Sequence, residues 1–227
     1  GFFLLAVYND SLFLLVTVLS LYSARRSQWV KAGIFGGLAA LARFPGLALF
    51  PALLTERFAT GRHDKKSLLA TFFVPAGFLL YLLYIQVTHG NWRLFTQSMG
   101  VWSQNKYVFP FQTLYRYMKI LTMNEFHFVS LIAVLELFTV IGSVYLVIWG
   151  RKKIRASYLA YAISYMIIPI SSGTFQGMPR YFIHAFPLVI LLAEALRKGK
   201  RRFIVLPLFL VLQFIFFAFF SQGHFVS

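Results

Sequence analysis

Residues 68–87 read LLATFFVPAGFLLYLLYIQV and contain no charged side chain. A transmembrane helix needs about 20 predominantly apolar residues to cross the hydrocarbon of a bilayer, and this stretch is long enough. Residues 126–149 and 203–220 form further apolar runs, and 59% of the chain is hydrophobic against only 12% charged. Soluble domains contain about 45–50% apolar residues. The sequence therefore predicts an all-α fold, a polytopic transmembrane helical bundle in contact with the lipid bilayer.

Basic residues occur in four clusters between the apolar runs. Short basic loops between apolar segments are typical of the cytoplasmic side of a membrane protein. We expect all four clusters to face the cytoplasm, so the chain between neighbouring clusters crosses the membrane an even number of times. The net charge of +16 comes largely from these loops, and no motif or groove-like basic surface indicates a nucleic-acid partner. The clusters are Arg25–Lys31, Arg57–Lys66, Arg151–Arg155 and Arg197–Arg202.

The last two clusters bracket a pair of predicted helices. Residues 158–170 would leave the cytoplasm, residues 171–180 would turn, and residues 181–196 would return. After the fourth cluster, residues 203–220 would cross once more. This places the C-terminus on the extracytoplasmic side.

A long loop is expected earlier in the chain. Residues 68–87 would leave the cytoplasm and residues 126–149 would return, which makes residues 88–125 an extracytoplasmic loop. We expect about seven or eight membrane segments in one integral-membrane domain covering residues 1–227. Its location would be a bacterial plasma membrane or, in a eukaryote, the endoplasmic reticulum.

The segment of residues 29–55 is too long for one membrane crossing and short for two. Pro45 disfavours helix at Phe44, and Gly46 tolerates a turn, so we expect two short helices joined at this point. Irregular backbone at membrane depth occurs where protein or a water-filled cavity surrounds it. Arg43 is therefore predicted to face an outward-open cavity.

The chain begins with Gly1, and residues 1–7 are already apolar without a signal-peptide pattern. We expect further N-terminal helices, and a first extracytoplasmic loop, to precede this residue.

Three charged residues outside the basic clusters are candidates for function, because a charge at membrane depth costs about 2.5–3.5 kcal/mol on insertion scales. Arg43 and Arg180 fall at predicted outward-facing breaks, and arginine presents a rigid fork of donors that suits phosphate oxygens. We expect both to bind a lipid phosphate; the alternative is that they snorkel to the interface. Asp10 would contribute a carboxylate to the same pocket, or would cap the helix that follows it.

Several neighbours could support this site. His184 lies one helical turn after Arg180 and is expected to share its face, although a packing role is also open. Lys106 is a further phosphate-binding candidate. The predicted loop is rich in aromatic and amide side chains, which suit sugar recognition but equally suit an interfacial aromatic belt. The supporting candidates are Tyr8, Trp102, Gln104 and Tyr181.

The remaining polar signals have simpler interpretations. Glu136 lies within an apolar run and is expected to be paired inside the bundle. Glu194 lies at helical spacing from Arg197 and Lys198 and is expected to form an interfacial ion pair. Gly33 and Gly37 form a small-xxx-small pattern that predicts close helix packing. The chain has no cysteine and shows no nucleotide, metalloprotease or nucleophile-elbow motif, so we expect no metal and no cofactor.

Three segments together resemble the GPI mannosyltransferase class V family and its bacterial relatives, within the GT-C superfamily of membrane glycosyltransferases. Residues 8–13 (YNDSLF) look like that family's Tyr-Ser-Glu-Ser-Leu-Phe pattern, and residues 40–46 (ALARFPG) look like its Thr-Arg-Pro-x-Gly. The third segment is residues 179–181 (PRY) together with Pro187. Two departures are that Asp10 stands where the family usually has glutamate and that Phe44 separates the arginine from the proline.

The resemblance implies an inverting transfer of mannose from a polyprenyl- or dolichyl-phosphate carrier to a glycan, lipid or protein acceptor on the extracytoplasmic side. It also implies that the main catalytic acidic residue lies in a loop upstream of Gly1, so no catalytic residue is assigned here. Two alternatives stay open. The first is a polytopic transporter or lipid flippase, which would also use broken helices and buried charges. The second is a noncatalytic assembly subunit.

Overall fold

The computed structural model describes residues 9–62, 64–101, 107–123, 128–197 and 202–222. Every regular element within these ranges is helical, which confirms the all-α prediction. In chain order the helices are α1 (Asp10–Arg25), α2 (Trp29–Ala42), the 3-10 helix η2 (Phe44–Ala48), α3 (Leu49–Ala59), α4 (Lys65–Thr71), α5 (Phe73–His89), α6 (Leu94–Val101), α7 (Pro110–Met123), α8 (Phe128–Gly150), α9 (Ala156–Ile170), α10 (Met178–His184), α11 (Phe186–Arg197) and α12 (Arg202–Ser221).

In the described part of the chain, three helical stretches are long and apolar enough to cross a membrane: Lys65–His89, Ser130–Gly150 and Arg202–Phe219. The pair α10 and α11 would make a fourth span if it is counted as one broken crossing. The expected number of seven or eight membrane segments is therefore too high. Apolar helices such as α2 (14 residues) and α9 (15 residues) are about 21–23 Å long at about 1.5 Å per residue, short of a ~30 Å hydrocarbon core.

Two further predictions need correction. Residues 88–125 are not simply a loop, because they contain α6 and the amphipathic α7. Residues 181–196 do not form one helix, because the chain bends by 88° between α10 and α11. Pro187 explains the bend, since proline lacks the N–H that would continue α10 and its ring clashes with a carbonyl of the preceding turn.

The predicted break in residues 29–55 is confirmed. Helix α2 ends at Ala42, Arg43 is extended (φ −152°, ψ 135°), and η2 leads into α3. The other predicted helices at residues 126–149, 158–170 and 203–220 correspond to α8, α9 and α12. The predicted Glu194–Arg197 ion pair is also present, at 3.1 Å.

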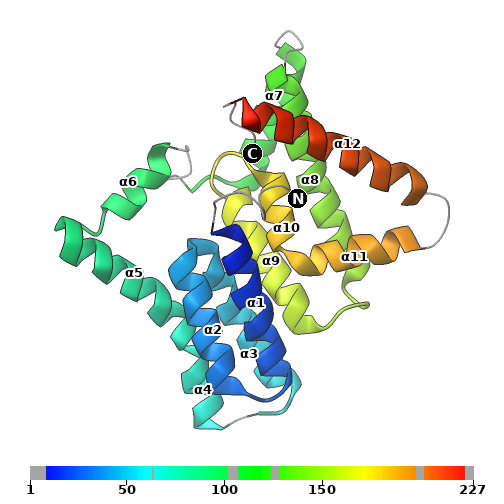
Figure 1. Cartoon of the computed structure of the whole chain (residues 1–227). Helices are drawn as coiled ribbons and strands as arrows, with labels where there is room; N and C mark the ends of the chain where they lie inside the picture. Colours follow the sequence, from blue (N-terminus) through cyan, green and yellow to red (C-terminus); the bar gives the residue numbers. More distant parts are fainter. Residues whose placement is uncertain (1–8, 63, 102–106, 124–127, 198–201, 223–227) are drawn as a thin grey trace.

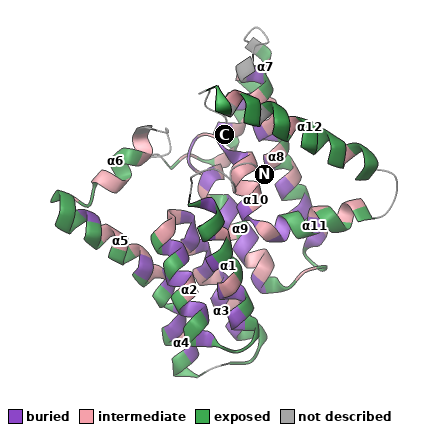
Figure 2. Ribbon diagram, in the orientation of Figure 1, coloured by how far each residue is buried: buried purple, intermediate pink, exposed green. Residues whose placement is uncertain are grey.

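The core includes the buried residues of α1, α2, α3 and α9, which pack together (Figure 1), and continues through α8, α10 and α11. Buried positions concentrate on these helices, whereas α12 is almost entirely exposed although it is strongly apolar (Figure 2). An apolar helix that buries so little against the protein is typical of a helix that faces lipid. Helix α3 is also tied to α9 by a polar contact, because Ser157 donates to the buried Glu56 carboxylate at 2.5 Å.

Glycine residues allow α2 to pack closely on α4 and α5. A Cβ atom on Gly33 would collide with the backbone of Ala70, one on Gly37 would lie 2.7 Å from the carbonyl oxygen of Phe73, and one on Gly77 would collide with the backbone of Gly37. The predicted packing role of Gly33 and Gly37 is therefore confirmed.

We expect Gly77→Ala to destabilise the protein by about 1–3 kcal/mol, because the new methyl group meets backbone that cannot move aside independently. Gly142 on α8 is the matched control, since nothing lies within 4 Å of a Cβ built there. Gly142→Ala should be neutral or stabilise by up to about 1 kcal/mol through helix propensity. Denaturation in detergent measures both, and equal effects at the two positions would contradict the packing role.

Candidate functional site

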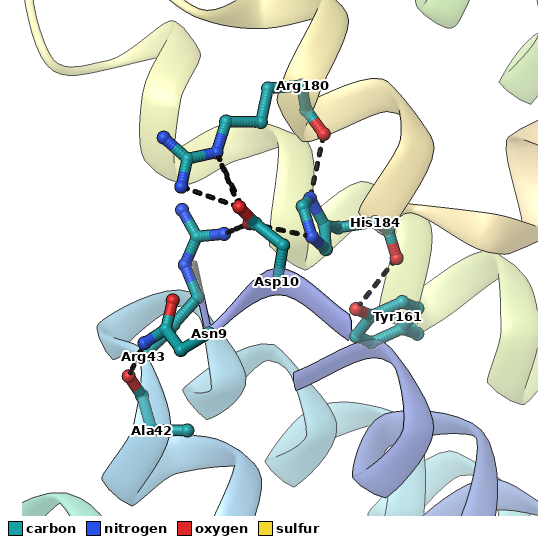
Figure 3. A network of polar contacts seen from close by, with 7 residues as sticks. All are labelled: Asn9, Asp10, Ala42, Arg43, Tyr161, Arg180 and His184. Carbon is teal, nitrogen blue, oxygen red and sulfur yellow. Dashed lines mark hydrogen bonds and ion pairs between the residues drawn. The ribbon is translucent and has the colours of Figure 1, made fainter. Parts of the chain in front are cut away.

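Asp10 is the first residue of α1, and its side chain is fully buried. The capping prediction for Asp10 is wrong, because Asn9 occupies the N-cap position and no side chain caps the helix. The Asn9 side chain instead donates to the carbonyl oxygen of Ala42 at 2.7 Å. This contact joins the start of α1 to the end of α2 and places the Asp10 carboxylate beside the helix break (Figure 3).

Arg43 reaches Asp10 from that break. Its Nη1 donates to Asp10 Oδ1, and its guanidinium lies 5.7 Å from the ring centroid of Phe13. The chain then turns tightly, because the Gly46 N–H donates to the Arg43 carbonyl oxygen at 2.9 Å and a Cβ on Gly46 would lie 2.5 Å from the backbone of Ala39. The Phe-Pro-Gly sequence after Arg43 thus fixes the direction in which this arginine points.

Arg180 reaches the same carboxylate from α10. Its Nη2 donates to Asp10 Oδ2 at 2.7 Å, and its Nε lies 3.1–3.2 Å from the two carboxylate oxygens. This is the two-pronged arrangement that the planar guanidinium favours. Helix α10 begins after Gly177, whose φ of 83° is a left-handed conformation that glycine adopts without strain.

His184 completes the cluster. Its Nε2 lies 2.9 Å from Asp10 Oδ1, and its Nδ1 lies 2.8 Å from the carbonyl oxygen of Arg180 one turn earlier. The predicted sharing of a face between Arg180 and His184 is confirmed. The Tyr161 hydroxyl donates to the His184 carbonyl oxygen at 3.1 Å, so α9 also holds this end of α10 in place (Figure 3).

Among the residues that the structure describes, the cluster has more positive charge than negative charge. Two guanidinium groups share one carboxylate, and their side chains remain partly accessible, at 14% for Arg43 and 25% for Arg180. A guanidinium has five N–H donors. Among the described residues, the hydrogen bonds of the Arg43 side chain are limited to the one from Nη1. Donors and charge are therefore available for an anion.

A mainly apolar pocket of about 250 Å³ lies beside the segments that carry the two arginines. Phe44 and Pro45 follow Arg43 and line the pocket, and Tyr181 follows Arg180 and lines it too. Helix α6 and the end of α9 form the other walls. The complete lining is Phe44, Pro45, Phe95, Thr96, Met99, Tyr107, Ile167, Ile168, Pro169, Ser171, Ser172 and Tyr181.

The structure thus brings together four of the predicted site residues, namely Asp10, Arg43, Arg180 and His184, and places Tyr181 at the neighbouring pocket. Within the described ranges, no group of three or more His, Cys, Asp or Glu residues could hold a metal ion. Four predicted residues lie outside the described residues: Tyr8, Trp102, Gln104 and Lys106.

Sequence reasoning missed the polar contacts that support this site. Tyr117 was not among the candidates, yet its hydroxyl donates to the buried Glu136 carboxylate at 2.7 Å. The charge of Glu136 inside an apolar helix was the available signal, and the expectation that this residue is paired inside the bundle is confirmed.

Comparison of the chain with protein-family models, with curated proteins and with solved structures gave no match. The resemblance to a mannosyltransferase family therefore stays a prediction from the sequence motifs, and function has to be argued from the site.

Proposed function

We propose that this protein is a membrane glycosyltransferase that moves a sugar from a polyprenyl- or dolichyl-phosphate carrier to a lipid- or protein-linked acceptor on the extracytoplasmic side. The sugar would be mannose if the motif resemblance holds. One observation carries the proposal: Arg43 and Arg180, from distant parts of the sequence, converge on one buried carboxylate beside a mainly apolar pocket.

The arginine pair suits a phosphate. Asp10 holds both guanidinium groups in fixed positions, so little side-chain freedom is lost when an anion binds. The excess positive charge attracts the anion, and arginine forks match phosphate oxygens in geometry. The pocket beside the arginines would accept the apolar part of the carrier next to its phosphate. A lipid phosphate combines such a charged group with an apolar chain in one molecule.

The arginines would also favour the reaction itself. In an inverting transfer, an acceptor hydroxyl oxygen bonds to the anomeric carbon while the bond from that carbon to the phosphate oxygen breaks. The acceptor proton passes to a base, and negative charge builds on the departing carrier phosphate. Fixed guanidinium groups stabilise that developing charge without reorganising.

Asp10 is a poor choice for the base. One of its oxygens accepts from Arg43 and the other from Arg180, and His184 lies within 2.9 Å. A general base needs a free oxygen within reach of the acceptor hydroxyl. We assign Asp10 the role of orienting the two arginines.

Sugar transfer by the protein carrying Arg43→Ala tests the proposal. We expect the KM for a mannosyl polyprenyl phosphate donor to rise by about 10- to 100-fold, because a charge-assisted hydrogen bond is worth about 1.5–3 kcal/mol. The assay follows labelled sugar and the release of free carrier phosphate at limiting donor.

Arg93→Ala is the matched control, since this exposed arginine lies outside the cluster and stacks on Trp92. Its kinetics should match those of the native protein. Unchanged turnover of Arg43→Ala at limiting donor would rule out a phosphate-binding role for Arg43.

A transporter or flippase is the second candidate, and the 88° bend between α10 and α11 favours it, because broken helices near buried charges form substrate sites in transporters. A transporter should move its substrate across liposomes without any sugar-phosphate donor. A transferase should release carrier phosphate only when both donor and acceptor are present.

A further inference from the structure

Glu136 is a buried carboxylate that the proposed reaction does not use. It lies within the candidate span Ser130–Gly150 of α8 and is 3% exposed. A charged side chain at such a position needs partners, because an unpaired buried charge is strongly unfavourable.

The two oxygens of Glu136 accept hydrogen bonds from two different elements. The Tyr117 hydroxyl on α7 donates to Oε2 at 2.7 Å, and the backbone N–H of Gly177 donates to Oε1 at 2.9 Å. Tyr117 is held in turn, because its hydroxyl oxygen accepts the Phe175 N–H at 3.1 Å and its ring packs on Phe175 with centroids 4.7 Å apart. Glu136 thus joins α7, α8 and the segment before α10.

Gly177 is the residue from which α10 starts. The Arg180 N–H donates to the Gly177 carbonyl oxygen at 2.9 Å, which closes the first turn of α10. The position of Gly177 therefore sets the position of Arg180, and one turn later that of His184. Both of these side chains contact Asp10.

The segment before α10, residues 171–177, is also held by contacts at its other end. Arg116 Nη1 donates to the Gly173 carbonyl oxygen at 3.0 Å, and the Val108 N–H donates to the Ser171 carbonyl oxygen at 3.0 Å. These contacts secure the beginning of the segment, whereas the contact of Glu136 secures its end, next to α10.

We propose that Glu136, oriented by Tyr117, is a positioning residue that fixes α10 so that Arg180 meets Asp10. The inference deepens the proposed function, because Arg180 is one of the two arginines assigned to the carrier phosphate. Glu136 is not among the residues that line the pocket, and it accepts the Gly177 N–H directly, so we assign its effect on Arg180 to that contact.

Chemical modification of arginines by phenylglyoxal, followed residue by residue with mass spectrometry, tests this without any activity assay. An arginine paired with a carboxylate reacts slowly, and its rate rises when the pair opens. Arg43 is the internal reference, because it reaches Asp10 from the break after α2 and does not depend on α10. Four variants are compared with the native protein: Glu136→Ala, Glu136→Gln, Tyr117→Phe and Ser143→Ala.

Glu136→Ala removes the acceptor of the Gly177 N–H, and the modification rate of Arg180 should rise about fivefold while that of Arg43 stays constant. Glu136→Gln keeps an oxygen that accepts the Gly177 N–H, and its amide N–H₂ can donate to the Tyr117 hydroxyl oxygen in place of the native bond in the other direction. The modification rate of Arg180 should therefore stay within about twofold of native. Tyr117→Phe should give a smaller rise than Glu136→Ala. Ser143→Ala is the matched control, since the buried Ser143 hydroxyl donates within α8 to Thr139 at 2.7 Å.

An unchanged Arg180 rate in both Glu136→Ala and Tyr117→Phe would overturn the inference. So would an equal rise at Arg43 and Arg180, because that pattern indicates general loosening of the fold. A rise at Arg180 alone in Glu136→Ala would support the positioning role. If the native protein at the same time binds no polyprenyl phosphate, the proposed function would be refuted while the positioning role stands.

Discussion

Asp10→Leu is expected to lower the free energy of unfolding by about 3–5 kcal/mol, the largest loss that we expect from a single substitution in this chain. The carboxylate is fully buried and accepts from Arg43 and Arg180. Removing it leaves two partly buried guanidinium groups facing each other without a counter-charge. Denaturation of the purified protein in detergent measures the loss.

Asp10→Asn keeps the size of the side chain but removes its charge, and we expect it to destabilise the protein as well, because both arginine pairs lose their counter-charge. Asp64→Asn is its matched control. The Asp64 carboxylate caps α4 by accepting the Ser67 N–H at 2.9 Å, which holds the pKa of Asp64 below its ordinary value. Asparagine caps a helix about as well as aspartate, so Asp64→Asn should be nearly silent. Equal stability of Asp10→Asn and Asp64→Asn would show that the charge of Asp10 is not what holds the arginines.

The sequence correctly predicted the features of the fold that depend on local residues. It did not predict the features that depend on how the helices pack against one another. Pro45 and Gly46 predict the break after α2, because proline restricts the backbone of the residue before it and glycine permits the turn. Long apolar runs predict α8, whose run is interrupted by Glu136, and α12, whose residues 203–220 carry no charge. The number of spans could not be counted correctly, because the rule that basic loops face the cytoplasm requires crossings without testing whether each helix is long enough.

Helix α7 shows a second limit. Residues 88–125 were predicted to be a loop from the positions of the basic clusters, and aromatic residues such as Tyr115 were interpreted as sugar contacts or an interfacial belt. The apolar positions instead recur with the period of a helix, and one face carries the buried Thr113 and Tyr117. The contact of Tyr117 with Glu136 could not be foreseen, since no local rule pairs residues from two separate helices.

The candidate site was predictable in its members but not in its geometry. Asp10, Arg43 and Arg180 were predicted as site residues because they are charges outside the basic loops. A charge at membrane depth is energetically costly and usually has a functional role. Their convergence links residues that are 33 and 170 positions apart in the sequence. Such contacts follow from how α1, α2 and α10 pack, and the sequence of one chain does not encode that packing in any readable motif.

The second large effect concerns the carrier phosphate itself. If Arg43 and Arg180 together bind it, the native protein should prefer a short-chain polyprenyl phosphate to the uncharged polyprenol by at least about a hundredfold in Kd, since each charge-assisted contact contributes about 1.5–3 kcal/mol. The apolar chain is the same in both ligands, so the apolar pocket contributes equally to the binding of the phosphate and of the alcohol. The double variant Arg43→Gln/Arg180→Gln keeps polar side chains at both positions but removes their charge.

The most direct measurement of the central claim is therefore the ratio of these two Kd values, determined in nanodiscs for the native protein and for Arg43→Gln/Arg180→Gln. We predict a preference for the phosphate of at least about a hundredfold in the native protein and a loss of most of that preference in the double variant, with polyprenol binding unchanged. Equal affinity of the native protein for the phosphate and for the alcohol would contradict the claim that the arginine pair recognises a lipid phosphate.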